Sequence, residues 1–265
     1  MSRRLRLDAE LVRRGLARSR DQAADLIAAG RVAVAGQQAA KPASQVSTDT
    51  AITVAQAGDD PGYVSRAGYK LAGALAAFGG LDVAGKRCLD AGASTGGFTD
   101  VLLRAGAGHV VAADVGYGQL AWSLRNEDRV TVLDRVNVRS LRPEQVAPAP
   151  ELVVADLSFI SLRLVLPALV DCAARGADFV LMVKPQFELG RERVRGGVVR
   201  DPALRAAAVA DVATAAAALG LGVAGIVASP LPGPSGNVEY FLWLRRGAPP
   251  LDNDELARAV AAGPQ

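Results

Sequence analysis

From residue 86 onward, short apolar runs alternate with amphipathic segments, and this alternation limits the fold more than any other feature of the chain. Seven runs have the length and composition of β-strands: 86–90, 109–115, 129–136, 151–157, 179–185, 221–227 and 239–245. Four segments between them favour helices: 99–106, 120–126, 162–176 and 202–220. Strands that alternate with helices in this way predict a doubly wound, parallel sheet.

The last two predicted strands are joined by residues 228–237, a segment rich in proline and glycine that shows no helical pattern. A short connection without a helix predicts an antiparallel closing pair. Such a pair is typical of class I methyltransferases rather than of dehydrogenases. We therefore expect an α/β fold of the class I (Rossmann-like) methyltransferase type, with a mostly parallel seven-stranded sheet. Residues 254–262 predict a short helix after it.

The amino-terminal part has a different pattern, which predicts a small α+β domain. Residues 6–14 favour a short helix that begins near Asp8. Ser19, with Gln22 three residues later, has the spacing of a capping box at the start of a second helix. The run 31–36 then alternates as a strand does and ends in a turn. We expect two short helices and a small hairpin here.

Charge is unevenly distributed along the chain. Nine Lys and Arg residues against four Asp and Glu residues give residues 1–41 a net charge of +5, whereas the whole chain carries +3. A small basic module ahead of a near-neutral domain suits a nucleic-acid binder, although a solvated helical face would carry the same charges. Together these patterns predict a domain at 1–56, a polar linker at 57–64 and a larger domain at 65–265.

A glycine-rich turn follows the first strand of the larger domain. Its glycines let the backbone approach a ligand closely, and the next helix presents free N–H groups. Such turns bind NAD, FAD and S-adenosylmethionine alike, but this spacing is not G-x-G-x-x-G, and Asp90 stands just before the first glycine. An acidic residue there favours the amino-acid end of S-adenosylmethionine over a pyrophosphate.

Asp114 ends the second strand about 20 residues later, where a carboxylate can accept hydrogen bonds from both ribose hydroxyls, or else cap a helix. Asn137, after the third strand, could contact the adenine amino group or be a turn residue. The candidate cofactor residues are Asp90, Gly92, Ser94, Gly96, Gly97, Phe98, Asp114, Val115, Asn137, Val138 and Asp156.

Four charged residues complete the candidate site. Asp156 and Lys184 end two predicted strands, Glu239 opens the last one, and Lys70 lies in the stretch leading into the domain. A ribose hydroxyl is a poor nucleophile until a base removes its proton, and a lysine can do so if burial or a second cation lowers its pKa. We expect Lys184 to be that base, although each of the four residues alone could form a surface salt bridge.

Several segments resemble the TlyA family of ribosomal RNA 2′-O-methyltransferases, which belongs to the FtsJ-like superfamily and is often labelled haemolysin A. These segments are 63–75, 88–107, 113–125, 154–162, 181–188, 196–201 and 229–244. The resemblance covers almost the whole chain and places the family's Lys-Asp-Lys-Glu tetrad on Lys70, Asp156, Lys184 and Glu239. Residues 6–54 also resemble the α-L RNA-binding motif of a ribosomal protein and of pseudouridine synthases.

The resemblance implies a cytoplasmic, monomeric enzyme that uses S-adenosylmethionine to methylate the 2′-hydroxyl of cytidine in the RNA of ribosomal subunits. It also implies RNA contacts by Arg6, Arg18, Arg20 and Arg66. The basic amino terminus and the last helix are similar to those of a longer subtype that modifies both subunits. In that subtype, loss of the modification confers resistance to tuberactinomycin-type antibiotics. One departure is that residues 62–65 lack the tryptophan found there in other members.

Three other functions are less consistent with the sequence. A membrane-active haemolysin, or another protein with a membrane partner, would need an uninterrupted apolar span or a lysine-rich amphipathic helix, and the chain has neither pattern. A catalytically inactive RNA-binding protein would not need the four charged residues. A nicotinamide-dependent dehydrogenase would have different glycine spacing. We expect no metal site, assign no role to His109, and expect Cys88 and Cys172 to be buried thiols.

Overall fold

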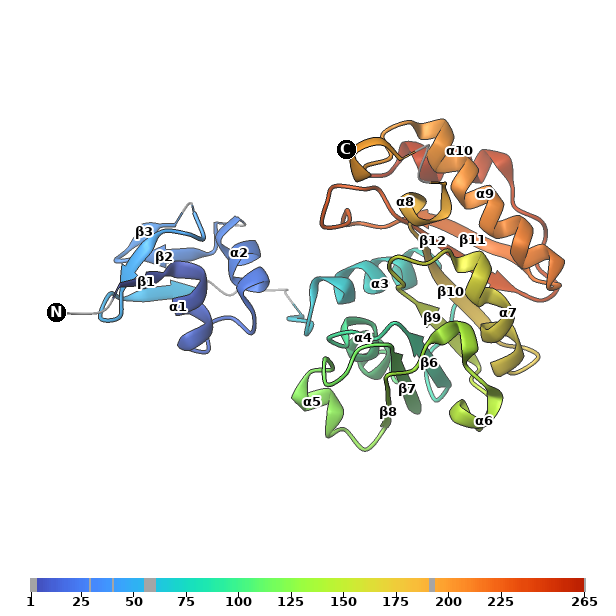
Figure 1. Ribbon diagram of the computed structural model, residues 1–265, viewed down its shortest axis with the longest axis horizontal. Coiled ribbons are helices and arrows are strands. Elements are labelled where there is room, and N and C mark those ends of the chain that lie inside the picture. Colours follow the sequence, from blue (N-terminus) through green and yellow to red (C-terminus); the bar gives the residue numbers. More distant parts are fainter. Residues whose placement is uncertain (1–3, 29, 40, 55–60, 191–193, 265) are drawn as a thin grey trace. The chain divides into compact units, whose positions relative to one another are not determined.

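The chain forms two compact units, residues Met1–Arg66 and Ala67–Gln265 (Figure 1). The computed structural model describes residues 4–28, 30–39, 41–54, 61–190 and 194–264.

The first unit combines two short helices with short antiparallel strands. The elements are β1 (Arg4–Arg6), α1 (Leu7–Arg13), α2 (Arg20–Ala28), β2 (Val32–Val34), β3 (Gln37–Gln38), β4 (Gln45–Ser47) and β5 (Ile52–Val54). β1 pairs with β4, and β2 lies between β3 and β5. The two helices and the β2–β3 hairpin were expected. The other strands are only three residues long, too short to show a period in the sequence.

The start of α1 differs from the expectation, because Asp8 does not cap it. Arg6 occupies the N-cap position without a side-chain hydrogen bond. The Asp8 carboxylate is buried and accepts hydrogen bonds from Arg6 at 2.8 Å and Arg20 at 3.0 Å. These guanidinium groups, Arg6 first, hold the pKa of Asp8 well below its usual range. Asp8 therefore links β1, α1 and α2 instead of capping one helix.

The start of α2 has half of the predicted capping box. The Ser19 hydroxyl accepts a hydrogen bond from the backbone N–H of Gln22 at 3.1 Å, as in a capping box. The Gln22 side chain, however, accepts from the backbone N–H of Arg18 at 2.7 Å rather than from that of Ser19. The Gln22 side chain thus bonds one residue before the position that a capping box requires. The Ser19 hydroxyl and the Gln22 amide oxygen nevertheless each have a hydrogen-bond partner.

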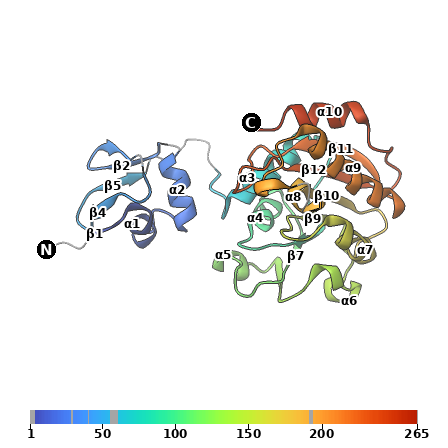
Figure 2. The ribbon, with the colours of Figure 1, turned by 45° about the horizontal axis from the view of Figure 1, so that its top comes forward.

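The second unit contains a seven-stranded sheet with helices on both faces (Figures 1 and 2). Its strands are β6 (Arg87–Ala91), β7 (His109–Asp114), β8 (Val130–Asp134), β9 (Leu152–Ala155), β10 (Asp178–Val183), β11 (Gly222–Ala228) and β12 (Tyr240–Arg245). Its helices are α3 (Arg66–Ala77), α4 (Gly97–Arg104), α5 (Trp122–Arg125), α6 (Pro143–Val146), α7 (Leu162–Cys172), α8 (Pro185–Glu188), α9 (Pro202–Ala218) and α10 (Asn253–Ala261).

The strand order is β11-β12-β10-β9-β6-β7-β8, and only β12 runs antiparallel to its neighbours. The expected parallel sheet with a helix-free closing hairpin is therefore confirmed. Helix α3 was not predicted as an element, because glycines and small residues weaken its apolar pattern. It begins where the first unit ends.

The five inner strands are buried on both faces, which explains their continuous apolar sequences, whereas the edge strands β8 and β11 are only partly buried. Leu89, Val153 and Leu181 face one core layer with α7, α9 and α10. On the other face, the Phe98 ring of α4 packs against Phe241 at a centroid distance of 6.0 Å. Because both faces of the sheet are covered, a ligand is expected at the edge where the carboxyl ends of the strands lie.

We predict that Glu10→Gln lowers the stability of the first unit and makes that stability less sensitive to acidic pH. Glu10 is fully buried and pairs with Arg13 and Arg14, each at 2.6 Å, and Arg13 is the main cause that lowers its pKa to about 2. A depressed carboxyl pKa contributes stability above the unfolded value of about 4.3, and this contribution is lost as pH falls toward 2.

Hydrogen exchange of α1 amides, measured from pH 5 down to pH 2, tests this prediction. In wild type the protection should fall steadily with acidification, whereas Glu10→Gln should start lower and change less. Asp49→Asn, at an exposed carboxylate of the same unit, is the matched control. Identical pH profiles for wild type and Glu10→Gln would contradict the prediction.

Candidate active site

Two lysine–carboxylate pairs lie at the edge formed by the ends of β9 and β10 and the start of β12. Lys184 Nζ is 2.6 Å from Asp156 Oδ1, and Lys70 Nζ donates to Glu239 Oε2 at 2.5 Å. Asp156 follows β9, Lys184 follows β10 and Glu239 precedes β12. Because β10 is hydrogen-bonded to both β9 and β12, these three residues start from neighbouring strands about 4.8 Å apart. Lys70 reaches them from α3.

The Lys70–Glu239 pair is almost completely enclosed, with side chains 8% and 1% exposed. An unpaired charge at that depth would cost several kcal/mol, so each residue requires the other. The loop before β12 fits closely around it: a Cβ atom on Gly233 would lie 2.6 Å from Glu239 Oε1. The buried Asn237 holds this loop by accepting from Val199 N at 2.9 Å. Gly233, the first glycine of the PGPSGN segment, is thus required because a side chain there would collide with the Glu239 carboxylate.

The Lys184–Asp156 pair is more open, with side chains 11% and 17% exposed. The Lys184 ammonium also donates a hydrogen bond to Ser158 Oγ at 3.0 Å. Asp156 Oδ1, although 2.6 Å away, is not in hydrogen-bond geometry with Lys184, and it has no other hydrogen-bond partner among the described residues. We therefore treat Asp156 as a close charge, and Ser158 as the aligned acceptor.

The glycine-rich turn after β6 forms a tight cradle. Gly92 and Gly96 have φ values of 88° and 95°, which favour glycine. A Cβ atom on Gly92 would lie 2.7 Å from the Asp156 carbonyl oxygen, and one on Gly96 would lie 2.3 Å from Leu124. Gly97 then opens α4. The turn therefore lies directly against the segment that carries Asp156.

Asp114 is tied to this turn. Its carboxylate accepts from the backbone N–H of Ser94 at 2.8 Å and from that of Gly116 at 2.6 Å. No helix begins in residues 115–119, all of which are described, so the alternative role of helix cap is not realised. Two backbone donors leave further lone pairs on the carboxylate, which can accept hydroxyl groups.

Asp90 is fully buried beneath the turn. One oxygen accepts from the Thr99 hydroxyl at 2.7 Å, and the other has no hydrogen-bond partner in the described part of the chain. Burial, the largest cause, raises the pKa of Asp90 to about 7. An orphaned carboxylate oxygen beside a glycine cradle fits a ligand that brings a cationic donor, such as the amino group of S-adenosylmethionine.

The remaining cofactor candidates differ in what they can offer. Phe98 and Val138 are buried in the core, so only their backbone groups can face a ligand. Val115 is 72% exposed just after Asp114. Asn137 Oδ1 accepts from Arg139 N at 3.0 Å and caps the short 3-10 helix Val138–Ser140. Asn137 is thus a turn residue, and its side-chain NH₂ group is what it can present to adenine.

Two aromatic residues at this edge were missed in the sequence. Phe159, three residues after Asp156, is 91% exposed and has a φ of 65°, unusual for a bulky residue. Its ring packs at a tilt against that of the half-buried Phe187, at a centroid distance of 5.1 Å. An exposed aromatic ring such as Phe159 can stack on a nucleobase. The signal in the sequence was weak, because SFIS reads as an ordinary apolar segment.

The arginines expected to bind RNA make contacts within the first unit. Arg6 and Arg20 share Asp8, yet their side chains remain 45% and 58% exposed. Arg18 donates to the carbonyl oxygens of Gly62 and Tyr63 at 2.7 and 2.6 Å. Arg66 lies 3.5 Å from an Asp25 oxygen. Arg6 and Arg20 therefore form an exposed pair, while Arg18 is bonded to the end of the predicted linker.

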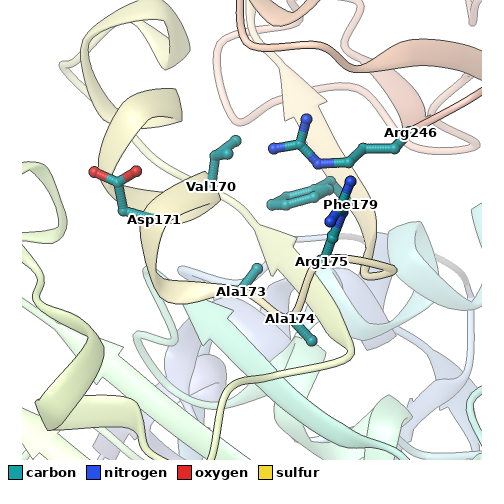
Figure 3. A pocket seen from close by; sticks show the side chains of 7 residues that line it. All are labelled: Val170, Asp171, Ala173, Ala174, Arg175, Phe179 and Arg246. Carbon is teal, nitrogen blue, oxygen red and sulfur yellow. The ribbon is translucent and has the colours of Figure 1, made fainter.

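A cavity of about 300 Å³ lies at the opposite end of the sheet, away from the charged pairs (Figure 3). It is lined by Val170, Asp171, Ala173, Ala174, Arg175, Phe179 and Arg246. Arg246 donates to the Leu219 carbonyl at 3.2 Å, just beyond α9, where a cation complements the helix dipole. We do not place the active site in this cavity, because the two lysine–carboxylate pairs do not line it.

Two features are absent from the part of the chain that the structure describes. No group of three His, Cys, Asp or Glu side chains there could hold a metal ion. No helix in the same part of the chain is long and apolar enough to cross a membrane.

Comparison with known proteins gives consistent matches. The FtsJ-like methyltransferase model matches residues 63–246, and the S4 domain model matches residues 5–52. The chain is 62% identical over 271 residues to the 16S/23S rRNA (cytidine-2′-O)-methyltransferase TlyA of Mycobacterium tuberculosis, covering 100% of both chains. It is 38% identical to Hemolysin A of Brachyspira hyodysenteriae, covering 89% of this chain and 98% of that one.

A solved structure from Streptococcus thermophilus, described as a hemolysin, has a TM-score of 0.78 and 38% identity, covering 98% of this chain and 96% of that chain. The family model, the identities and the shared fold agree with the site geometry. The chain therefore belongs to the TlyA group of the FtsJ-like methyltransferase family and carries an S4 domain at residues 5–52.

Proposed function

We propose that this protein transfers a methyl group from S-adenosylmethionine to the 2′-hydroxyl of a cytidine in ribosomal RNA. The observation that carries the proposal is the convergence of two lysine–carboxylate pairs at the sheet edge, next to a glycine cradle. Its relatives include rRNA (cytidine-2′-O)-methyltransferases, which supports the substrate and the position of transfer.

In this proposal Lys184 removes the proton from the 2′-hydroxyl. It is the more accessible of the two lysines, and it must be neutral to act as a base. Lys70 stays paired with Glu239 and fixes the opposite wall. With Lys184 neutral, the four residues carry a net charge of −1, which suits a cationic methyl donor beside them. S-adenosylmethionine, when bound, supplies an electrophilic methyl group on sulfur.

The residues around the turn would hold the cofactor. Asp114 would accept the ribose hydroxyls, and Asp90 would face the amino group of the methionine part. Gly92 and Gly96 have no side chains, so a ligand can approach the backbone of the turn closely. Phe159 and Phe187 would support the target base from the other side of Lys184.

RNA docking by the first unit is the second part of the proposal. Arg6 and Arg20, held together by Asp8, present a preformed pair of guanidinium groups that suits RNA phosphates. Arg18 and Arg66 keep their proposed roles as RNA contacts, but their present partners leave them fewer free donors. Such contacts position a protein without reading sequence.

We further propose that the substrate is RNA within both ribosomal subunits, and that the protein acts as a cytoplasmic monomer. The proposed domain limits are 1–56, 57–64 and 65–265, supported by the division into units after Arg66 and by the family matches. On this account, deleting the gene lowers susceptibility to tuberactinomycin-type antibiotics, and restoring the wild-type gene but not a Lys184→Ala variant reverses it.

The first prediction concerns the base. Lys184→Ala should lower methyl transfer to isolated ribosomal subunits by at least about 100-fold, because a positioned base contributes roughly 10²–10⁴-fold. Transfer is measured with labelled S-adenosylmethionine, and subunit binding should persist. Lys86→Ala, at a lysine on the opposite edge of the sheet, is the control. Near wild-type turnover in Lys184→Ala would remove this residue from the mechanism.

The second prediction concerns the cofactor. Asp114→Ala should weaken S-adenosylmethionine binding by roughly 1.5–3 kcal/mol, the range for hydrogen bonds to a charged group. The affinity of Asp114→Asn should lie between those of wild type and Asp114→Ala, because the amide keeps one acceptor oxygen. Calorimetry gives the affinities, with Asp128→Ala at an exposed carboxylate as control. If all four proteins bind equally well, Asp114 only shapes the turn.

The third prediction concerns docking. The triple variant Arg6→Gln/Asp8→Asn/Arg20→Gln removes both guanidinium groups and also the buried carboxylate that would be left unpaired. It should bind subunits more weakly and with a shallower salt dependence, by roughly 0.7–0.9 in the log–log slope per lost phosphate contact. Arg258→Gln, at an exposed arginine of α10, is the control. Unchanged binding at two salt concentrations would place docking elsewhere.

A further inference from the structure

The loop after β9 and the segment after β10 are joined by three side-chain contacts in succession. Ser158 accepts from Lys184 at 3.0 Å, Phe159 stacks on Phe187, and Ser161 donates to Glu188 at 2.5 Å. The buried Glu188 also accepts from the backbone N–H of Leu162 at 2.8 Å. These contacts fix the loop along the segment that carries the proposed base.

The backbone of the loop is strained at one point. Phe159 has a φ of 65°, a conformation that is unfavourable for a bulky residue and persists only where the surroundings hold it. The residue before it is Ser158, which is exposed at the mouth of the site, and whose hydroxyl turns back to Lys184. The strained turn therefore lies next to the residue that contacts the base.

Ser158 is the partner that the Lys184 amine meets in hydrogen-bond geometry, whereas Asp156 is the nearer charge. A neutral amine has two N–H groups and one lone pair, and only the lone pair can take a proton. The aligned hydrogen bond to Ser158 fixes one N–H, whereas the Asp156 contact is close but not aligned. Without the hydroxyl, the amine can rotate about its Cε–Nζ bond, and its lone pair loses a defined direction.

We propose that Ser158 is a positioning residue for the methyl-transfer reaction, aiming the lone pair of Lys184 at the 2′-hydroxyl. This inference rests on the proposed role of Lys184 as the base. A hydroxyl suits the task because its oxygen can accept an N–H of the neutral amine and, after proton transfer, an N–H of the ammonium. It can therefore hold the nitrogen in both states and leaves the lone pair free, without adding a charge.

The test compares Ser158→Ala with Ser158→Thr. Loss of orientation should lower kcat roughly 10- to 100-fold in Ser158→Ala, as expected for a misplaced catalytic group, with KM for subunits and affinity for S-adenosylmethionine unchanged. Ser158→Thr keeps a hydroxyl and should recover most of the activity. Thr214→Ala removes an exposed hydroxyl from α9 and is the control. Thermal unfolding shows whether each variant is folded.

A second readout does not depend on turnover. In ¹⁵N-labelled protein without cofactor, the Nζ–H signal of Lys184 should be visible in wild type and Ser158→Thr, and broadened by faster exchange in Ser158→Ala. If wild type transfers no methyl group, the proposed function fails, but this signal still tests the contact. If wild type is active and Ser158→Ala matches it in both kcat and Nζ–H exchange, the positioning role is wrong.

Discussion

The site depends on the arrangement of two lysine–carboxylate pairs at the edge of the sheet. Charges at this depth are stable only when they are paired, and each pair needs residues from distant parts of the chain. Lys70 is brought by α3 to Glu239, and Lys184 stands beside Asp156 at the ends of adjacent strands. Close fits at Gly233 and Gly92 follow from the same arrangement, because both glycines lie against this group of residues.

The two pairs have different environments, and this difference separates their proposed tasks. Lys70 and Glu239 are enclosed and bonded directly, so they suit a fixed wall of the site. The pair of Lys184 and Asp156 is more open, and Lys184 has one aligned partner in Ser158, which precedes the exposed Phe159. A base must exchange its proton and reach its substrate, so we assign that role to Lys184 rather than to Lys70.

Much of the fold could be predicted from the sequence, because period and length mark buried strands and long helices well. All seven strands of the sheet and the closing hairpin were expected. Local patterns failed where a side chain has a distant partner. The sequence does not show that Asp8 accepts from Arg20 or that Arg18 donates to the backbone carbonyls of residues 62 and 63. The stacking of Phe159 depends on a backbone conformation that its residue type does not indicate.

The most direct test of the account is the chemical position of the transferred methyl group. Ribosomal subunits are treated with the protein and labelled S-adenosylmethionine, and the RNA is then hydrolysed with alkali. Alkaline cleavage requires a free 2′-hydroxyl, so a 2′-O-methyl group protects the bond that follows it. The account predicts that the label is recovered in an alkali-resistant dinucleotide that begins with cytidine. Label recovered in a mononucleotide, with the methyl group on a base, would contradict it.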